Sequence, residues 1–590
     1  MDTLRYTSLA QMFFVNCERE DFSGWYHRRR ESWVYFPRQQ LRKHTQFLAL
    51  ALKQRGLSKN QSVGIVANSC PEWVMTDVAT QLNHARVVPL FPNISVENFS
   101  FQCDEADVQV LLVNDINELD PCIREQLPRF KTVICIDPYS DLPQNGIYWN
   151  DLMKEGEELS RKPESSLWLH SQLEQISSED IFSIISTSGS TGRPKGVPLT
   201  HRNMISQLQV IKRDFLKLSR STDIAMVILP IAHVFERMSV YFFIMNRITI
   251  YFADSPKNVA KLAREVHPTV MTVVPRILER VYESMTVAGE RAWGLNRFVI
   301  DRAVKVAKID KPGSLLNSMH LVYDRLVYSK MRSAVGGKLR MVVCGGGALN
   351  KSICRFLMNV GIPVYEGYGL TECSPVLSVN KPGAMRPGSV GHVLTHLQVK
   401  IGENNEVLAK GDSVFGGYYN MPELNAQIFT EDGFFKTGDQ GYFDEDGFLF
   451  LTGRLKELLK TSTGKYVCPN PIELELSRHP LIEQALVIAN GRKFASALIF
   501  LNAENAKRFL KRTETDFKLG RALESRHVYE AINRHIERVN QKLNHWEKIC
   551  KWTLIGDPLS VESGLLTPTL KIRRTVAEAR YAKEIEAMYS

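Results

Sequence analysis

Hydrophobic residues recur with a helical period in some stretches of this chain and form short continuous runs in others. Residues 41–54 show the helical period, with apolar side chains gathered on one face. Short runs rich in β-branched residues lie at 62–66, 87–90, 108–113, 225–229, 248–252, 269–274 and 341–344. Strands that alternate with helices predict βαβ units around mostly parallel sheets. We therefore expect an α/β fold in the larger part of the chain.

The pattern changes after residue 415 to short strands separated by Gly-containing turns. The segments EDGFFKTGD, FDEDGFLFLTGR and STGKYV each have the pattern of a β-hairpin. Beyond residue 470, a helix is predicted at 471–477, strands at 485–488 and 495–501, and a long helix at 528–546. The apolar stripe of the long helix predicts a helix that faces a core, with a membrane-surface helix as the alternative.

This change of pattern predicts a domain boundary near residue 455. We expect a large N-terminal domain over 1–455, built from several subdomains with mostly parallel sheets and including a β-rich subdomain at about 376–455. Residues 456–590 are expected to form a small α+β domain.

Composition and charge narrow the class of protein. Of the 590 residues, 44% are hydrophobic and 23% are charged, which excludes wholesale disorder and fibrous structure. The net charge of +10 favours acidic partners such as nucleotides, nucleic acid or anionic lipid. The ten cysteines form no C-x-x-C pair, and no uninterrupted apolar run is long enough to span a membrane. We therefore expect a cytoplasmic protein without a transmembrane segment.

A candidate phosphate-binding loop, STSGSTGRPKG, occupies residues 186–196. Its glycines let the backbone curl around an anion, its hydroxyl and N–H groups donate hydrogen bonds, and Lys195 supplies positive charge, so a polyphosphate is the expected ligand. The loop differs from a Walker A loop, because Lys195 lies three residues beyond Gly192 and is followed by Gly196. A helix with Thr200 as its N-cap is expected after the loop, whereas a flexible Ser/Gly linker is the alternative.

The loop STSGSTGRPKGV resembles the signature loop of the adenylate-forming superfamily, which contains acyl-CoA synthetases, luciferases and the adenylation domains of peptide synthetases. Four further motifs follow in the order of that family: YEGYGLTE at 365–372, KTGD at 436–439, GRLKELLKTSTGKYV from 453 and LTPTLKIRR from 566. LPIAHVFER at 229–237 and VVPRILERVY at 273–282 are similar to the long-chain fatty acyl-CoA synthetase branch. The resemblance covers nearly the whole chain. The sequence departs from the family pattern at 83–85 and at Ser186, where a tyrosine is common.

The resemblance implies a ligase that uses ATP, Mg²⁺ and coenzyme A. A fatty carboxylate would attack the α-phosphorus of ATP, giving acyl-adenylate and pyrophosphate, and the thiol of coenzyme A would then displace AMP. Lys571 would bridge the carboxylate and the α-phosphate, although an exposed basic residue is its alternative. Glu372 would hold Mg²⁺ and Thr371 would bind a phosphate. Lys195 would hold the leaving pyrophosphate, together with Thr187, Ser188, Gly189, Ser190, Thr191 and Gly192.

Further nucleotide-binding positions follow from the same resemblance. The adenine would lie against Gly345, Gly346, Gly347 and Ala348, with Tyr368 on its other face and Gly369 beside it. Asp439 and Arg454 would hold the ribose hydroxyls, although Gly438-Asp439 is also an ordinary turn. Lys456 matches the hinge about which the C-terminal domain, as a mobile lid, would rotate between the two half-reactions. Gly464 would then line the pantetheine tunnel.

Two features keep alternatives open. His233 resembles a residue that lies over the acyl channel, but a histidine between apolar neighbours is also an ordinary core residue. The segment 25–44 mixes arginines with aromatic residues, which favours either peripheral contact with the anionic inner face of a membrane or a hairpin with a solvated basic face. No nucleic-acid partner is expected, because the positive charge is spread along the chain.

Two rival functions are compatible with the same motifs. One is a fatty acyl-AMP ligase that loads an acyl carrier protein, and the other is a catalytically inactive fatty-acid-binding protein on the same fold. The sequence leaves open the acyl chain length, the oligomeric state and the pathway.

Overall fold

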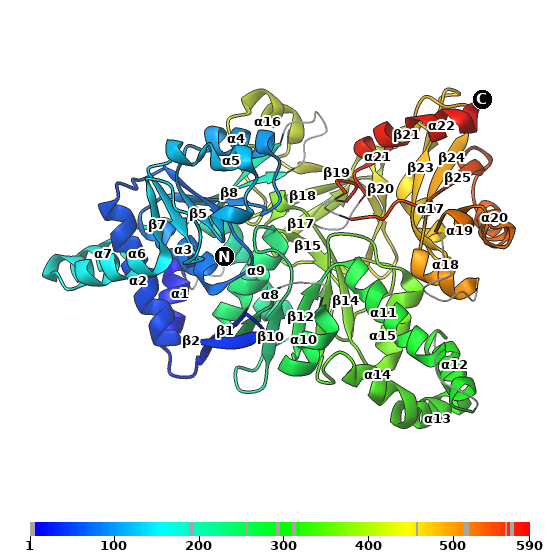
Figure 1. Ribbon diagram of the computed structural model, residues 1–590, viewed down its shortest axis with the longest axis horizontal. Helices are drawn as coiled ribbons and strands as arrows, with labels where there is room; N and C mark the ends of the chain where they lie inside the picture. Colours follow the sequence, from blue (N-terminus) through cyan, green and yellow to red (C-terminus); the bar gives the residue numbers. More distant parts are fainter. Residues whose placement is uncertain are drawn as a thin grey trace. The chain divides into compact units, whose positions relative to one another are not determined.

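The computed structural model describes residues 6–187, 194–215, 217–254, 258–290, 295–309, 314–455, 458–510, 519–560, 563–566 and 572–590 (Figure 1). The chain forms two compact units. The first unit comprises Met1–Val399 and Ala409–Lys436, and the second comprises Lys400–Leu408 and Thr437–Ser590.

The first unit contains a seven-stranded sheet. Its strands, in spatial order, are β7 (Gly146–Tyr148), β6 (Thr132–Cys135), β5 (Val108–Val113), β3 (Ser62–Val66), β4 (Arg86–Leu90), β8 (Ile181–Thr187) and β9 (Lys195–Thr200). All neighbours are parallel except β8 and β9, which pair antiparallel at one edge. The mostly apolar strands β3 and β5 are buried at every position except Gln109, as expected for strands covered on both faces.

The first unit also contains a nine-stranded sheet. Its strands, in spatial order, are β16 (His392–Val393), β15 (Val376–Val379), β14 (Val364–Gly369), β13 (Met341–Cys344), β12 (Val270–Val273), β10 (Ile224–Val227), β11 (Thr249–Phe252), β1 (Gly24–Arg29) and β2 (Ser32–Pro37). The six strands from β14 to β1 are parallel, and antiparallel strands close both edges. The predicted α/β fold with mostly parallel sheets is confirmed.

Helices cover these sheets. They are α1 (Leu9–Glu18), α2 (Arg38–Gln54), α3 (Pro71–Leu82), α4 (Val96–Glu105), α5 (Pro121–Arg124), α6 (Trp149–Ser160), α7 (Pro163–Gln175), α8 (His201–Asp214), α9 (Val234–Met245), α10 (Val259–Val266), α11 (Pro275–Glu290), α12 (Leu295–Ala307), α13 (Ser314–Tyr323), α14 (Ser329–Ser333), α15 (Lys351–Val360) and α16 (Pro422–Ile428). A π-helical turn, η4 (Asp324–Tyr328), joins α13 to α14. Helix α1 contacts α3, α8 and α9, so these four helices form a layer beside the sheets (Figure 1).

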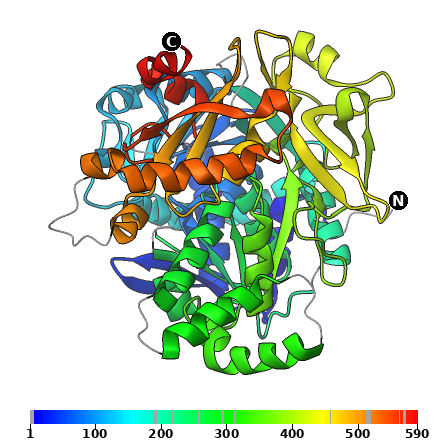
Figure 2. The same ribbon diagram turned by 90° about the vertical axis from the view of Figure 1, so that its right-hand side faces the viewer.

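Three smaller sheets lie in the second half of the chain. Their strands are β17 (Leu397–Ile401), β18 (Glu406–Gly411), β19 (Phe435–Phe443) and β20 (Leu449–Arg454); β21 (Leu459–Lys460) and β22 (Tyr466–Val467); and β23 (Ile482–Ile488), β24 (Ala495–Leu501) and β25 (Ile549–Ile555). The helices are α17 (Pro469–Leu476), α18 (Ala503–Phe509), α19 (Leu519–Leu523), α20 (Arg526–Asn540), α21 (Arg574–Arg580) and α22 (Ala582–Tyr589). Figure 2 shows α20 lying across one face of the sheet β23–β25.

The helix expected after the phosphate loop, with Thr200 as its N-cap, is confirmed as α8. A strand that was not predicted, β9, precedes this helix and pairs with β8, so that Thr187 lies opposite Lys195. The long C-terminal helix ends at Asn540 rather than at Trp546, because the Asn540 side-chain amide bonds to both backbone groups of Ile549 and turns the chain into β25. Its apolar stripe faces the core, as predicted.

A buried polar network ties the seven-stranded sheet to the helical layer. The guanidinium of Arg237 on α9 donates to both carboxylate oxygens of Asp77 on α3, at 2.8 and 2.6 Å, and to the Ser183 hydroxyl on β8, at 2.6 Å. The Tyr241 hydroxyl also donates to Asp77, at 2.7 Å. Both members of the ion pair are almost fully buried. The network therefore fixes β8, the strand that leads into the phosphate loop.

Among the residues that the structure describes, no helix combines the length and apolar character that crossing a membrane requires.

Candidate functional site

The predicted adenine-binding residues lie at the carboxyl ends of two neighbouring parallel strands. Residues 345–348 follow β13, and Tyr368 and Gly369 end β14, which pairs with β13. Residues 346–348 are exposed, whereas Tyr368 is buried. A Cβ at position 369 would lie 2.1 Å from the carbonyl oxygen of Pro375, so glycine is required there. Ligands of open α/β sheets bind at this end of the strands.

The first turn of α9 packs against this segment. A Cβ on Gly345 would lie 3.4 Å from the Phe235 ring. His233 is half-buried and caps α9, because its Nδ1 accepts a hydrogen bond from the Phe235 N–H at 3.3 Å. The structure thus gives His233 a capping position beside the predicted adenine segment, and its role over the acyl channel stays a prediction.

Lys195 and Glu372 are 177 positions apart in the sequence. Both side chains contact the same residue, Tyr418. The Lys195 ammonium lies 5.0 Å from the centre of the Tyr418 ring. The Tyr418 hydroxyl donates to Glu372 Oε1 at 2.8 Å. Burial and the neighbouring carboxylate raise the pKa of the Tyr418 phenol, so it remains a hydrogen-bond donor. The cluster Lys195–Tyr418–Glu372 therefore places one cation and one carboxylate in the same part of the first unit.

Other predicted residues of the first unit lie near this cluster in sequence and structure. Thr187 ends β8, pairs with Lys195 across the hairpin and donates from its hydroxyl to the Lys195 carbonyl at 3.4 Å. Thr371 begins a 3₁₀ turn, Thr371–Cys373, that carries Glu372. The loop residues Ser188, Gly189, Ser190, Thr191 and Gly192, and also Lys456 and Lys571, lie outside the described residues.

The second unit holds the predicted ribose-binding pair. Asp439 on β19 lies opposite Arg454 on β20, and Arg454 Nε donates to Asp439 Oδ1 at 2.8 Å. Asp439 is buried and Arg454 is half exposed, so the guanidinium fixes the carboxylate from the solvent side. Gly464 lies in the exposed turn between β21 and β22, with a positive φ of 82°. A carboxylate fixed in this way can accept hydrogen bonds from hydroxyl groups.

Comparison with known proteins decides the family. The model of the AMP-binding enzyme family matches residues 26–419, and that of the AMP-binding enzyme C-terminal domain matches residues 456–590. The long-chain-fatty-acid–CoA ligase FadD15 of Mycobacterium bovis is 31% identical over 558 residues, which cover 92% of this chain and 90% of the relative. The chain belongs to the AMP-binding enzyme family. Its branch is that of the long-chain acyl-CoA synthetases.

Further relatives agree with this membership of the AMP-binding enzymes. The long-chain-fatty-acid–CoA ligase 5 of Rattus norvegicus is 29% identical, over 94% of this chain and 84% of the relative. The A-PCP didomain of carboxylic acid reductase from Segniliparus rugosus, solved in complex with AMP, has a TM-score of 0.77 and 18% identity, over 100% of this chain and 83% of that one. The anthranilate CoA ligase AuaEII, in complex with anthranoyl-AMP, has a TM-score of 0.70 and 18% identity, over 98% and 97% of the two chains. These structures share the fold.

The site residues of this AMP-binding enzyme are chemically suited to bind a nucleotide together with Mg²⁺. Glu372 presents a buried carboxylate, a hard oxygen ligand, and bonds to the Tyr418 side chain, whose ring the Lys195 cation also contacts. Mg²⁺ is commonly bound by one or two carboxylates together with substrate phosphates rather than by a cage of protein ligands. Within the described part of the chain, no group of three or more His, Cys, Asp and Glu side chains lies together as a metal site.

Tyr418 was not predicted from the sequence as a site residue. We expect it to orient the Glu372 carboxylate. Tyr418→Phe removes the hydrogen bond to the carboxylate, and a bond of this kind to a charged group contributes about 1.5–3 kcal/mol. We expect pyrophosphate release to fall about tenfold or more. The half-maximal Mg²⁺ concentration is also expected to rise, because the carboxylate becomes free to rotate. Initial rates across a Mg²⁺ titration measure both effects.

Tyr419→Phe is the matched control, because it removes the adjacent hydroxyl, which accepts from Arg86 at 3.0 Å. It is expected to leave the Mg²⁺ dependence unchanged. Equal shifts in the two variants would show that Tyr418 does not position the carboxylate.

Another buried carboxyl, Glu366, lies on β14 two residues before Tyr368. Burial raises its pKa to about 7, although it accepts a hydrogen bond from the Gly388 N–H at 3.1 Å and lies near Cys354 and Lys351. Between about pH 4.5, its ordinary value, and pH 7, the folded protein binds more protons here than the unfolded chain. This group therefore lowers the free energy of unfolding as the pH rises through that window.

Glu366→Gln keeps an acceptor for Gly388 but removes the titration. Relative to the wild type, its free energy of unfolding should increase by about 3 kcal/mol between pH 4.5 and pH 7 and then level off. Urea unfolding across this pH range measures the difference. Glu431→Gln, at an exposed position, is the control for the exchange of glutamate for glutamine and should change the free energy of unfolding by no more than about 0.5 kcal/mol. If the free energies of unfolding of Glu366→Gln and the wild type differed by the same amount at every pH, the pKa of Glu366 would not be raised.

Proposed function

We propose that this protein activates a long-chain fatty acid with ATP and transfers the acyl group to coenzyme A, releasing AMP and pyrophosphate. The observation that carries the proposal is the 31% identity over 92% of the chain to a long-chain-fatty-acid–CoA ligase. The geometry of the first unit supports it, because Lys195 and Glu372 meet through Tyr418 while residues 345–348 and Tyr368 end adjacent strands.

The first half-reaction has an electrostatic obstacle, because the carboxylate and the α-phosphate are both anionic. Two like charges about 4 Å apart repel by about 4 kcal/mol at an effective dielectric constant near 20, which corresponds to about a thousandfold in rate. In our proposal Lys571 lies between the two anions and removes most of this repulsion. Catalysis is then mainly positioning and charge neutralisation.

The remaining residues bind the nucleotide in this proposal. Lys195 and the hairpin loop hold the β- and γ-phosphates, and Thr371 contacts a phosphate. Glu372 holds Mg²⁺, which neutralises phosphate charge when bound. The adenine lies between residues 345–348 and Tyr368, with Gly369 beside it. The buried Asp439 carboxylate, fixed by Arg454, accepts hydrogen bonds from the ribose hydroxyls.

The second half-reaction involves the C-terminal domain in this proposal. Lys456 serves as a hinge, residues 456–590 act as a mobile lid, and the turn that holds Gly464 lines the path of the coenzyme A thiol. The match of the C-terminal family model from residue 456 supports this division of the chain. No general base is needed, because a thiol with a pKa of about 8.5 is partly ionised near neutrality and adenylate is a good leaving group.

The proposed function is tested by product analysis with ATP, coenzyme A and a series of short, medium and long fatty acids. We expect acyl-CoA, AMP and pyrophosphate in equal amounts, with the highest rates for long chains. Accumulation of acyl-adenylate without acyl-CoA would favour a ligase that loads a carrier protein. If no pyrophosphate were released in response to a fatty acid, the protein would instead be a catalytically inactive fatty-acid-binding protein.

A further inference from the structure

The helix formed by α13, η4 and α14 exposes large apolar side chains on its outer face. Leu321 is 74% exposed, Val322 56% and Leu326 53%. Phe298 on α12 is also exposed, and α12 contacts both α13 and η4. In both views these helices lie together (Figures 1 and 2, green). Contiguous exposed apolar side chains mark interaction surfaces more often than single ones do.

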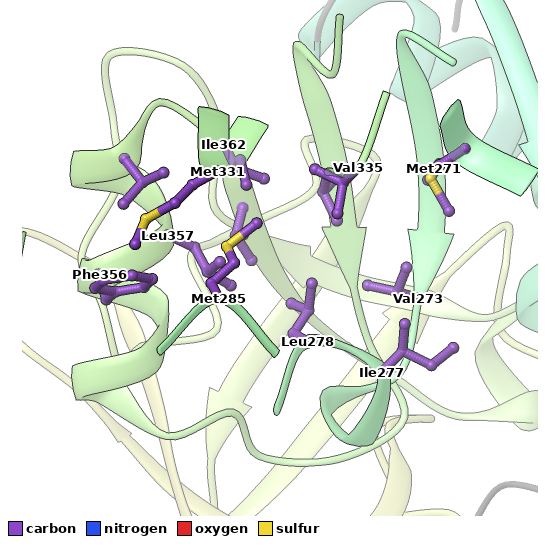
Figure 3. Close-up of a cluster of buried hydrophobic side chains, with 14 of the residues drawn as sticks. Met271, Val273, Ile277, Leu278, Met285, Met331, Val335, Phe356, Leu357 and Ile362 are labelled. Carbon is purple, nitrogen blue, oxygen red and sulfur yellow. The ribbon is translucent and has the colours of Figure 1, made fainter. Parts of the chain in front are cut away.

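The inner face of the same helix already fills a core. Tyr323, Val327, Tyr328 and Met331 are buried in the cluster that includes Phe356 and Leu357 of α15. Figure 3 shows Met331 among these side chains. An amphipathic surface helix needs only one apolar face to fold against its domain. The outer apolar face therefore contributes nothing to the core.

Basic residues outnumber acidic ones on the helices that carry this outer face. Residues 295–333 contain eight Lys or Arg and three Asp, a net charge of +5 out of +10 for the whole chain. Arg325 and Lys330 are exposed on the helix itself, and Arg302 and Lys305 are exposed on α12. The Arg302 guanidinium lies 5.4 Å from the centre of the Phe298 ring. Exposed apolar residues flanked by Lys and Arg are the pattern of a helix that lies in a membrane interface.

We propose that the outer face of α12, α13, η4 and α14 docks onto an anionic lipid bilayer, with Leu321, Val322 and Leu326 inserted among the acyl chains. The positive charge of the basic residues indicates which partner binds this face. An anionic surface attracts them, whereas a second copy of this chain would bring two faces of the same positive charge together. This surface goes beyond the proposed function, since the chemistry of the site does not depend on it.

The N-terminal hairpin of β1 and β2 is a weaker candidate for the same partner. Its Arg28 is ion-paired with Glu265 and its Arg29 with Glu72. With the pair of Arg42 and Glu18, these carboxylates neutralise three of the six Lys and Arg residues in the segment 25–44. The lipid contact is therefore assigned to the helices rather than to the hairpin.

The test is co-sedimentation of the full-length protein with phosphatidylcholine vesicles that contain or lack phosphatidylglycerol. We expect binding to the anionic vesicles and its loss at high salt. Leu321→Ser combined with Leu326→Ser should weaken binding by at least about tenfold. Arg325→Ala should weaken it about fivefold, as expected for one basic residue near an anionic surface. Leu167→Ser on α7 is the matched control, because Leu167 is also 74% exposed, and it should leave binding unchanged.

Two readouts separate this proposal from misfolding and from the proposed function. Pyrophosphate release with a fatty acid presented in detergent micelles should be the same in the wild type and in all three variants. The wild type and the leucine variant are expected to have the same oligomeric state at the concentrations used for sedimentation. Three results would each overturn the lipid contact. They are equal binding by the wild type and the leucine variant, no binding of the wild type to either kind of vesicle, and dissociation of a wild-type dimer by the leucine substitutions.

Discussion

Lys571→Ala is expected to reduce acyl-adenylate formation about a thousandfold and to leave the conversion of preformed acyl-adenylate to acyl-CoA largely intact. The proposed bridge between two anions exists only in the first half-reaction. In the second half-reaction the attacking thiol meets an adenylate whose leaving group is already activated. Fatty-acid-dependent pyrophosphate release measures the first step, and a single-turnover assay with synthetic acyl-adenylate and coenzyme A measures the second.

Lys583→Ala is the matched control, because Lys583 is an exposed lysine of α22 in the same C-terminal region. This variant should be indistinguishable from the wild type in both assays. Equal losses in both steps for Lys571→Ala would show that this lysine supports the structure or binds adenylate generally. Unchanged adenylation would remove it from the site altogether.

Arg237→Met is expected to lower the free energy of unfolding by about 3–5 kcal/mol. The substitution leaves Asp77 as a buried carboxylate that has lost its cation, and it also removes the donor to Ser183 on β8. The Arg237 guanidinium further lies 4.8 Å from the centre of the Phe182 ring and 5.1 Å from that of Trp73, and these contacts are lost. Urea unfolding followed by tryptophan fluorescence measures the change.

The double variant Asp77→Leu with Arg237→Met distinguishes pairing from packing. Because both charges are then absent, its loss should be much smaller than the sum of the two single losses. Arg161→Met, which breaks an exposed pair with Glu157 on α6, should cause no measurable change. If the loss in free energy of unfolding of the double variant equalled the sum of the two single losses, Asp77 and Arg237 would not stabilise the fold as an ion pair.

Local patterns were sufficient to predict much of the fold. The strands β3, β5, β13 and β24 have the predicted bounds, because each is a short, mostly apolar run that is largely buried in the sheet. The N-cap of α8 was also predictable, since Thr200 and Asn203 form a local capping box. By contrast, β9 has the sequence KGVPLT, whose Gly and Pro weaken a strand pattern. It forms a strand because β8 lies opposite it.

Contacts between distant segments could not be predicted from one sequence. Tyr418 and Glu372 are 46 positions apart, and Asp77 and Arg237 are 160 apart. Neither Tyr418 nor Asp77 lies in a motif that marks it, since a tyrosine after two glycines or a carboxylate within a buried helix has many structural explanations. The family motifs predict the reacting groups, whereas the residues that orient them depend on how the sheets and helices pack.

The most direct test of the account is a crystal structure of this protein with a nonhydrolysable acyl-adenylate analogue. We predict that the adenine lies against residues 345–348 and Tyr368, and that the phosphate mimic lies near Thr371, with Lys195 and Glu372 beside it. An analogue bound elsewhere, with this site empty, would contradict the proposed site and with it the assigned roles of its residues.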